Sequence, residues 1–203
     1  MNSHTERVRI AGPAGEIECA IDEPAEPPKG VAVLCHPHPL HGGTMDNKVV
    51  QTLARAFVQI GLRAVRFNYR GVAGSQGQWD EGRGEVDDAL AVIAAHRDAA
   101  LPLQLGGFSF GGYVAAQAAH QLPEAERPAW LALVAPSTRK QDVPPVPEGT
   151  LVVHGESDDV VPLEATLDWA RPQALPVVVI PGAGHFFHGQ LTLLKNLVVR
   201  YGS

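Results

Sequence analysis

The stretch LPLQLGGFSFGGYVAAQAA, residues 101–119, decides the fold. Its first five residues are typical of a buried strand, and residues 112–119 are rich in small residues and typical of a helix. Between them, Gly107-Phe108-Ser109-Phe110-Gly111 is a G-x-S-x-G pentapeptide. A strand, a sharp turn and a helix around this pattern indicate a nucleophile elbow that exposes the serine hydroxyl. The alternative is a glycine-rich turn without chemistry, so the rest of the chain must supply the catalytic partners of Ser109.

Composition limits the class of protein. The chain has 203 residues, which suits one domain spanning residues 1–203, and its 45% hydrophobic content is sufficient for a full core. A net charge of −6 argues against a nucleic-acid partner. The N-terminus lacks a signal-like apolar stretch and no run approaches the length of a membrane span, so we expect a cytoplasmic protein without a membrane partner. In that compartment Cys19 and Cys35 are expected to be buried free thiols.

Strand and helix patterns alternate along most of the chain. A hairpin is expected over residues 7–21, and further strands over 30–35, 62–68, 101–105, 130–134, 150–154 and 176–180. Helices are expected over residues 47–60, 84–96, 112–119, 163–170 and 190–201. This order predicts an α/β fold: a mainly parallel sheet of about 7–8 strands with helices on both faces, an N-terminal hairpin and no cap domain. Ligands of such sheets bind at the carboxyl ends of the strands.

A serine nucleophile needs a base, and the base needs an acid to orient it. After an elbow serine the acid comes first in the chain and the histidine second. The loop after the strand at 151–153 offers Glu156, Asp158 and Asp159, of which we favour Asp158. The loop after the last strand offers His185, directly after a Gly-x-Gly turn, and His188, which we expect to open the last helix. We favour His185 as the base.

An oxyanion hole needs two backbone N–H groups aimed at the developing charge. One is expected from Phe110, the residue after the nucleophile. The other is expected from the loop His36-Pro37-His38-Pro39-Leu40-His41-Gly42-Gly43. Because proline has no N–H group, His38 is the natural donor in this loop.

These landmarks together resemble the α/β-hydrolase superfamily, and within it the small cap-less bacterial hydrolases related to dienelactone hydrolase and prolyl-oligopeptidase-type domains. The resemblance covers nearly the whole chain and also includes Arg66-Phe67-Asn68-Tyr69-Arg70-Gly71. It implies that Ser109 is the nucleophile, Asp158 the acid and His185 the base, with His38 and Phe110 as oxyanion donors. Two features depart from the pattern: Asn68 stands where many relatives carry Asp, and His-Pro replaces the commoner His-Gly. Dienelactone hydrolase uses a cysteine nucleophile, so its substrate is not implied.

The function that follows is a serine hydrolase that cleaves small ester or thioester substrates through an acyl-enzyme, without a cofactor or metal. Alternatives are a non-catalytic binding protein with this fold, and an acyltransferase or peptidase that uses the same triad. A metal site formed by the histidines at 36, 38 and 41 with Asp46 is a third alternative, although the spacing is not that of a zinc site. We expect an open, shallow site for small or extended acyl groups, to which Gln76, Trp79 and Trp130 could contribute. The substrate and the oligomeric state are left open.

Overall fold

The computed structural model describes residues 5–128 and 130–202. The strands are β1 (Glu6–Gly12), β2 (Gly15–Asp22), β3 (Val31–Cys35), β4 (Arg63–Phe67), β5 (Leu103–Phe108), β6 (Leu131–Val134), β7 (Leu151–Gly155) and β8 (Val177–Ile180). The helices are α1 (Lys48–Gln59), α2 (Arg83–His96), α3 (Phe110–Gln121), α4 (Leu163–Ala170) and α5 (Leu191–Gly202). Three short 3-10 turns join them: η1 (Pro39–His41), η2 (Glu124–Glu126) and η3 (Arg171–Gln173).

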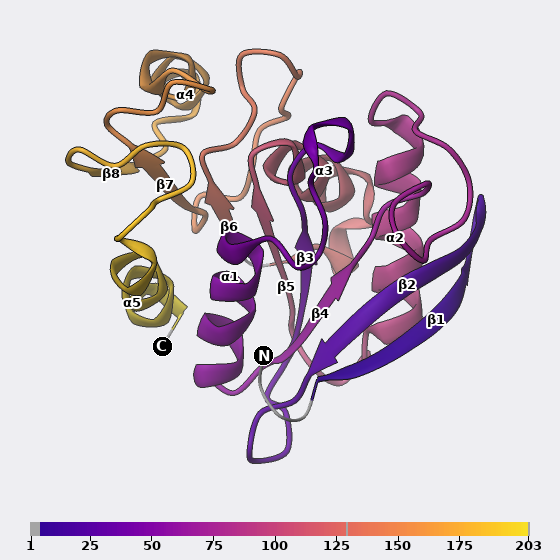
Figure 1. The fold of residues 1–203 in the computed structure, drawn as a ribbon. Helices are drawn as coiled ribbons and strands as arrows, with labels where there is room; N and C mark the ends of the chain where they lie inside the picture. The colour runs from indigo at the N-terminus through magenta and orange to yellow at the C-terminus, as the bar shows by residue number, and fades with distance from the viewer. Residues whose placement is uncertain (1–4, 129, 203) are drawn as a thin grey trace.

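The eight strands form one sheet in the order β1-β2-β4-β3-β5-β6-β7-β8. The hairpin β1–β2 is antiparallel and joins β4 antiparallel, whereas every pair from β4 to β8 is parallel. In Figure 1 the hairpin forms one edge of the molecule and β7 and β8 lie near the other. The expected α/β-hydrolase fold, with its mainly parallel sheet and N-terminal hairpin, is therefore confirmed.

Helices cover both faces of the sheet because the central strands are apolar on both sides. On β3, Ala32 and Leu34 pack in a cluster with residues of α1 and α5, while Val31 and Val33 pack in a second cluster with residues of α2 and α3. This alternation follows from the two-residue period of a strand. Figure 1 shows α1 and α5 together on the near side of the sheet.

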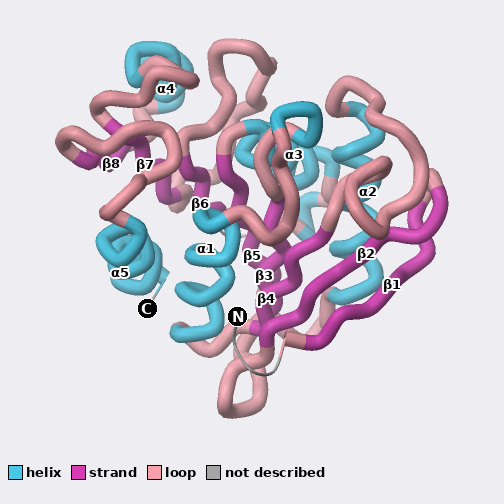
Figure 2. The backbone as a smooth tube through the Cα atoms, viewed as in Figure 1, coloured by secondary structure: helices cyan, strands magenta, loops and turns pink. Residues whose placement is uncertain are grey.

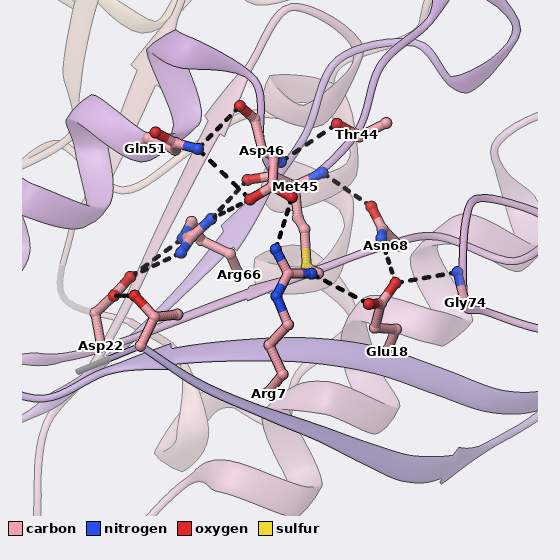
Figure 3. Close-up of polar contacts among 11 residues, drawn as sticks. Arg7, Glu18, Asp22, Thr44, Met45, Asp46, Gln51, Arg66, Asn68 and Gly74 are labelled. Carbon is pink, nitrogen blue, oxygen red and sulfur yellow. Dashed lines mark hydrogen bonds and ion pairs between the residues drawn. The ribbon is translucent and has the colours of Figure 1, made fainter. Parts of the chain in front are cut away.

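A polar network ties the hairpin to the segment that precedes α1 (Figure 3). Arg66 of β4 is 5% exposed and pairs with Asp22 of β2 at 3.0 Å. Its guanidinium also donates to the carbonyl oxygen of Met45 at 3.0 Å and to the Asp46 carboxylate at 3.1 Å. Asn68 accepts from the amide of Met45 at 2.9 Å and donates to Glu18 at 2.8 Å. The strands β2 and β4 therefore hold residues 45–46, the continuation of the loop after β3.

Most expected elements match the structure to within a few residues, with two differences near the elbow and the last helix. Strand β5 runs on to Phe108 rather than ending at Leu105. His188 does not open the last helix, because α5 begins at Leu191 and His188 lies in the turn before it. Cys19 and Cys35 are buried free thiols, as expected.

The loops that follow the strands gather at one edge of the sheet, the upper side of Figure 2. Residues 36–47 follow β3, Ser109 follows β5, and longer connections follow β6 and β7. None of these loops forms a separate cap among the described residues. Within residues 5–128 and 130–202, no helix combines the length and the hydrophobicity that crossing a bilayer requires.

Candidate active site

Ser109 sits in a strained turn between β5 and α3. Its backbone has φ 56° and ψ −119°, a conformation that costs a non-glycine residue about 1–3 kcal/mol. The turn is held from both sides, because the amide of Ser109 donates to Val134 at 2.9 Å and its carbonyl oxygen accepts from Gly112 at 2.9 Å. Such strain, retained by its surroundings, is a mark of functional sites.

Glycine at both ends of the pentapeptide is a steric requirement. A Cβ on Gly107 would lie 2.0 Å from the carbonyl oxygen of Gly111. A Cβ on Gly111 would lie 2.1 Å from the carbonyl oxygen of Cys35, at the end of β3. Both distances are far below van der Waals contact, so the sharp turn and its close packing against β3 exclude any side chain there.

The structure brings Ser109, His185 and Asp158 into one hydrogen-bonded row. The hydroxyl oxygen of Ser109 lies 3.0 Å from Nε2 of His185, and Nδ1 of His185 lies 2.7 Å from Oδ2 of Asp158. Because a carboxylate only accepts, Nδ1 carries the proton and Nε2 of the neutral ring accepts from the serine hydroxyl. This is the tautomer that allows an imidazole to take a proton from serine.

The loop after β7 holds Asp158 in place. Its Oδ1 accepts from the amides of Val160 at 2.9 Å and Val161 at 2.8 Å, which leaves Oδ2 for His185. Burial raises the pKa of Asp158, but the hydrogen bonds from His185 and from these two amides outweigh burial and leave the pKa below its ordinary value. The carboxylate is therefore ionised at neutral pH.

His154, in β7, also holds the loop that follows this strand. Its Nε2 lies 2.9 Å from the carbonyl oxygen of Val161 and 3.5 Å from Oδ2 of Asp158. Burial lowers the pKa of His154, so the ring is neutral and its Nε2–H donates to Val161. Sequence reasoning treated His154 only as the end of a strand.

The other acid and base candidates lie outside this row. Glu156 accepts from the amide of Gly182 at 2.8 Å and so braces the loop that carries His185. Asp159 is exposed, and His188 lies in the turn before α5.

The backbone amides of His38 and Phe110, both in residues that line the cavity beside Ser109, form no hydrogen bond with another described residue. Phe110 is the first residue of α3, where an amide has no acceptor within the helix. The His38 amide belongs to a trans peptide whose oxygen, on Pro37, accepts from Nδ1 of His36 at 2.7 Å. In a trans peptide the N–H points opposite to the C=O, so the His36 ring determines where the His38 amide points.

His36 itself is fully buried and neutral. Its Nε2 accepts from the amide of Tyr69 at 3.2 Å, while the hydroxyl of Tyr69 donates to the His36 carbonyl oxygen at 3.1 Å. Burial lowers the pKa of His36 to about 3, against its hydrogen bond to Pro37, which raises it. Both ring nitrogens are thus engaged with backbone atoms and neither is available to a metal. The described residues contain no group of three or more His, Cys, Asp or Glu side chains arranged to hold a metal ion.

A cavity of about 380 Å³ opens above Ser109, near the lower end of the range for small-molecule sites. Its described lining comes from the loops after β3, β5, β6, β7 and β8: Pro37, His38, His41, Gly42, Gly43, Asn47, Ser109, Phe110, Ser137, Arg139, Lys140, Val160, Val161, His185 and Phe186. Ser109 is 8% exposed and reaches this cavity.

A larger hollow of about 880 Å³ lies at the amino ends of the strands, where it is lined by Lys29, Leu62, Pro102 and Trp130 among others. Neither Ser109, His185 nor Asp158 lines it. Because ligands of parallel sheets bind at the carboxyl ends, the smaller cavity is the candidate active site.

The cavity lining includes residues that the sequence did not single out, among them Ser137, Arg139 and Lys140. They follow β6 in the connection 137–149, which gave no motif. Of the three residues suggested from the sequence, none lines this cavity. Gln76 instead accepts from the amide of Glu16, Trp130 packs on Phe57, and Trp79 lies behind His38 with ring centroids 4.7 Å apart.

Comparison with known proteins gives the same assignment as the fold. A family model described as serine aminopeptidase matches residues 26–149. An α/β serine hydrolase without a lid from Xanthomonas campestris is 36% identical, with a TM-score of 0.89 over 99% of this chain and 94% of that chain. An α/β serine hydrolase homologue from Coxiella burnetii is 42% identical, with a TM-score of 0.86 over 98% of this chain and 97% of that chain. An uncharacterized protein from Rickettsia prowazekii is 34% identical over 196 residues, which cover 89% of this chain and 82% of the relative. The chain therefore belongs to the serine hydrolase family that this model and these relatives represent, within the α/β-hydrolase superfamily.

Proposed function

We propose that this protein is a serine hydrolase that cleaves small ester or thioester substrates through a Ser109–His185–Asp158 triad. The observation that carries the proposal is the row of hydrogen bonds of 3.0 Å and 2.7 Å from Ser109 to His185 to Asp158, in which Ser109 lines a cavity of about 380 Å³. A serine becomes an effective nucleophile when a neutral imidazole accepts its proton and a carboxylate orients that imidazole.

In the first step, the hydroxyl oxygen of Ser109 attacks the carbonyl carbon of the substrate while Nε2 of His185 takes the hydroxyl proton. The negative charge that develops on the carbonyl oxygen is stabilised by the amides of His38 and Phe110, each worth about 3–4 kcal/mol on the scale of known oxyanion donors. Asp158 stabilises the imidazolium without taking its proton.

Collapse of the tetrahedral intermediate breaks the bond to the alcohol or thiol, which leaves with the proton from His185. Water then enters, and Nε2 of His185 takes a proton from it as its oxygen attacks the acyl carbon. A second collapse releases the acid and returns the proton to Ser109. Every proton transfer in this cycle passes through His185, and water is the second reactant beside the substrate.

Ester or thioester cleavage fits the cavity better than removal of an N-terminal amino acid, the activity in the description of the matching family model. A free amino terminus is a cation, and its recognition calls for a carboxylate in the site. Among the described residues that line the cavity, none is Asp or Glu. The cytoplasmic location and the lack of nucleic-acid or membrane partners remain predictions of the sequence.

The proposal is tested by turnover of p-nitrophenyl butyrate. Wild-type protein is expected to hydrolyse it, and Ser109→Ala is expected to lower kcat by 10³-fold or more, on the scale of other serine hydrolases. The variant should keep the circular dichroism spectrum of the wild type. Equal turnover by both proteins would contradict the proposal.

A further inference from the structure

Two cations, Arg139 and Lys140, form part of the cavity wall. They stand out because the chain as a whole carries a net charge of −6 and no described residue of the cavity lining is acidic. Other arginines, such as Arg66 and Arg70, are held by carboxylates. Neither Arg139 nor Lys140 forms an ion pair or hydrogen bond with another described residue. The described part of the site thus contains cationic charge that the protein itself does not neutralise.

The turn that carries these cations is fixed to the nucleophile. The amide of Ser137 donates to the carbonyl oxygen of Ser109 at 3.1 Å, and the amide of Gln141 closes the turn on Ser137 at 3.1 Å. The hydroxyl of Thr138 lies 3.1 Å from that of Thr166 in α4. Although the side chains of Arg139 and Lys140 are exposed, their backbone is anchored beside Ser109.

The positive charge of Lys140 acts on His38, the proposed oxyanion donor in the loop after β3. The pKa of His38 is lowered first by burial, then by the charges of His41 and Lys140. An anion bound in the cavity would therefore meet positive potential from the loop after β6 close to the carbonyl position.

The cavity lining also has an apolar part. Val160 and Phe186, from the loops after β7 and β8, line the cavity and are 46% and 45% exposed. Large apolar side chains left exposed at the mouth of a site are candidates for covering the apolar part of a ligand. The cavity thus combines an apolar surface with a cationic one.

We propose that the natural substrate is an ester or thioester that carries a carboxylate group, which Arg139 and Lys140 bind while Val160 and Phe186 cover its apolar part. The proposal rests on the hydrolase function above and adds a class of substrate to it. A guanidinium can bind a carboxylate through two parallel hydrogen bonds, and a neighbouring ammonium adds a further charge. Binding at this partly exposed position should change kcat/KM by roughly ten-fold, since charge-assisted contacts exceed ordinary surface ion pairs.

The test uses two pairs of substrates that are similar in size and differ mainly in charge. Mono-p-nitrophenyl glutarate is compared with p-nitrophenyl pentanoate, which places the anion on the acyl side. 4-Acetoxybenzoate is compared with its methyl ester, which places the anion on the leaving group. In each pair the ratio of kcat/KM for the anionic ester to that for the neutral ester is measured after spontaneous hydrolysis is subtracted.

The double variant Arg139→Gln/Lys140→Gln is expected to lower this ratio roughly ten-fold in at least one pair, mainly through KM, with a smaller effect in high salt. Arg200→Gln is the control for loss of positive charge outside the cavity: Arg200 lies at the exposed end of α5, and its substitution should leave both ratios unchanged. Unchanged ratios in both pairs, with Ser109 still required for turnover, would overturn the anionic-substrate proposal alone. Turnover that does not depend on Ser109 would overturn the hydrolase function itself.

Discussion

The Nδ1 atom of His36 donates a hydrogen bond of 2.7 Å to the carbonyl oxygen of Pro37, the residue that follows it. The same ring accepts from the amide of Tyr69, so the loop after β4 and the loop after β3 are joined through one buried imidazole. Because the oxygen of Pro37 and the amide of His38 belong to one planar peptide, this bond fixes the direction of the proposed oxyanion donor. His36 is therefore a positioning residue that acts through His38.

Two substitutions of His36 separate its two hydrogen bonds. In His36→Asn the amide nitrogen can take the place of Nδ1 and donate to Pro37, whereas in His36→Gln the amide oxygen can take the place of Nε2 and accept from Tyr69. We expect His36→Gln to lower kcat roughly ten-fold with little change in KM, a part of the effect of a lost oxyanion donor. His36→Asn should retain clearly more of kcat. Equal losses in the two variants, or a loss confined to KM, would contradict the positioning role.

His36 also makes stability depend on pH. The folded protein lowers the pKa of its ring from 6.5 to about 3, so between these values the unfolded chain binds a proton that the folded chain does not. The free energy of unfolding therefore falls as pH drops below 6.5, by up to about 1.4 kcal/mol per pH unit from this group. Urea unfolding at several pH values between 6.5 and 4.5 gives the slope of the free energy of unfolding against pH. This slope should be shallower by this amount in His36→Asn than in the wild type. Identical slopes would mean that His36 is not held neutral by the fold.

The close contact between the elbow and β3 predicts a strong effect of one methyl group. In Gly111→Ala the new Cβ would lie 2.1 Å from the carbonyl oxygen of Cys35, which forces backbone to move. We expect a loss of about 3 kcal/mol in the free energy of unfolding, at the upper end for overpacked sites. Gly184→Ala is the matched control, because its Cβ would meet only the carbonyl oxygen of Ser157 at 3.8 Å. Thermal unfolding that places both variants at the same Tm would rule out the tight elbow described above.

The polar network of Figure 3 predicts a contrast between two aspartates that share Arg66. Asp22 is 8% exposed at its side chain and Asp46 is 41% exposed. Asp22→Ala leaves a buried guanidinium without its main partner and should lower the free energy of unfolding by about 3 kcal/mol. Asp46→Ala removes a half-exposed partner and should lower it by less than about 1 kcal/mol. Urea titrations of the two variants in parallel measure the contrast, and a larger loss from Asp46→Ala would reverse this account of the network.

Much of the fold was accessible from the sequence because the apolar runs of the central strands and the periodicity of the helices are local signals. Strand β5 was predicted to end too early, since Gly106 and Gly107 are typical of turns. In the structure they are strand residues that pair with β3 and β6, and glycine is required at 106 because a Cβ there would lie 2.7 Å from the side chain of Leu34 in β3. That steric demand comes from a neighbouring strand and is invisible in the local sequence.

Some residues of the candidate site were likewise predictable from the sequence, and others were not. The residues of the hydrogen-bonded row were predictable because Ser109 has a motif and each partner follows a strand in a fixed order. Ser137, Arg139 and Lys140 were missed because their place beside Ser109 depends on how the irregular connection 137–149 folds back, which no periodicity encodes. The role of His36 was missed because it depends on the amide of Tyr69, after β4, which approaches the ring from a distant part of the sequence.

The central claim, that Ser109 is an activated nucleophile, is tested most directly by its reaction with a fluorophosphonate, followed by mass spectrometry of the intact protein and its peptides. The account predicts a single adduct on Ser109 of the folded wild type, slow labelling in His185→Ala and none in Ser109→Ala. Ser137, which is 8% exposed and lines the same cavity without a histidine partner among the described residues, serves as an internal control and should stay unlabelled. Folded protein that gives no adduct, or an adduct on Ser137 in place of Ser109, would contradict the account.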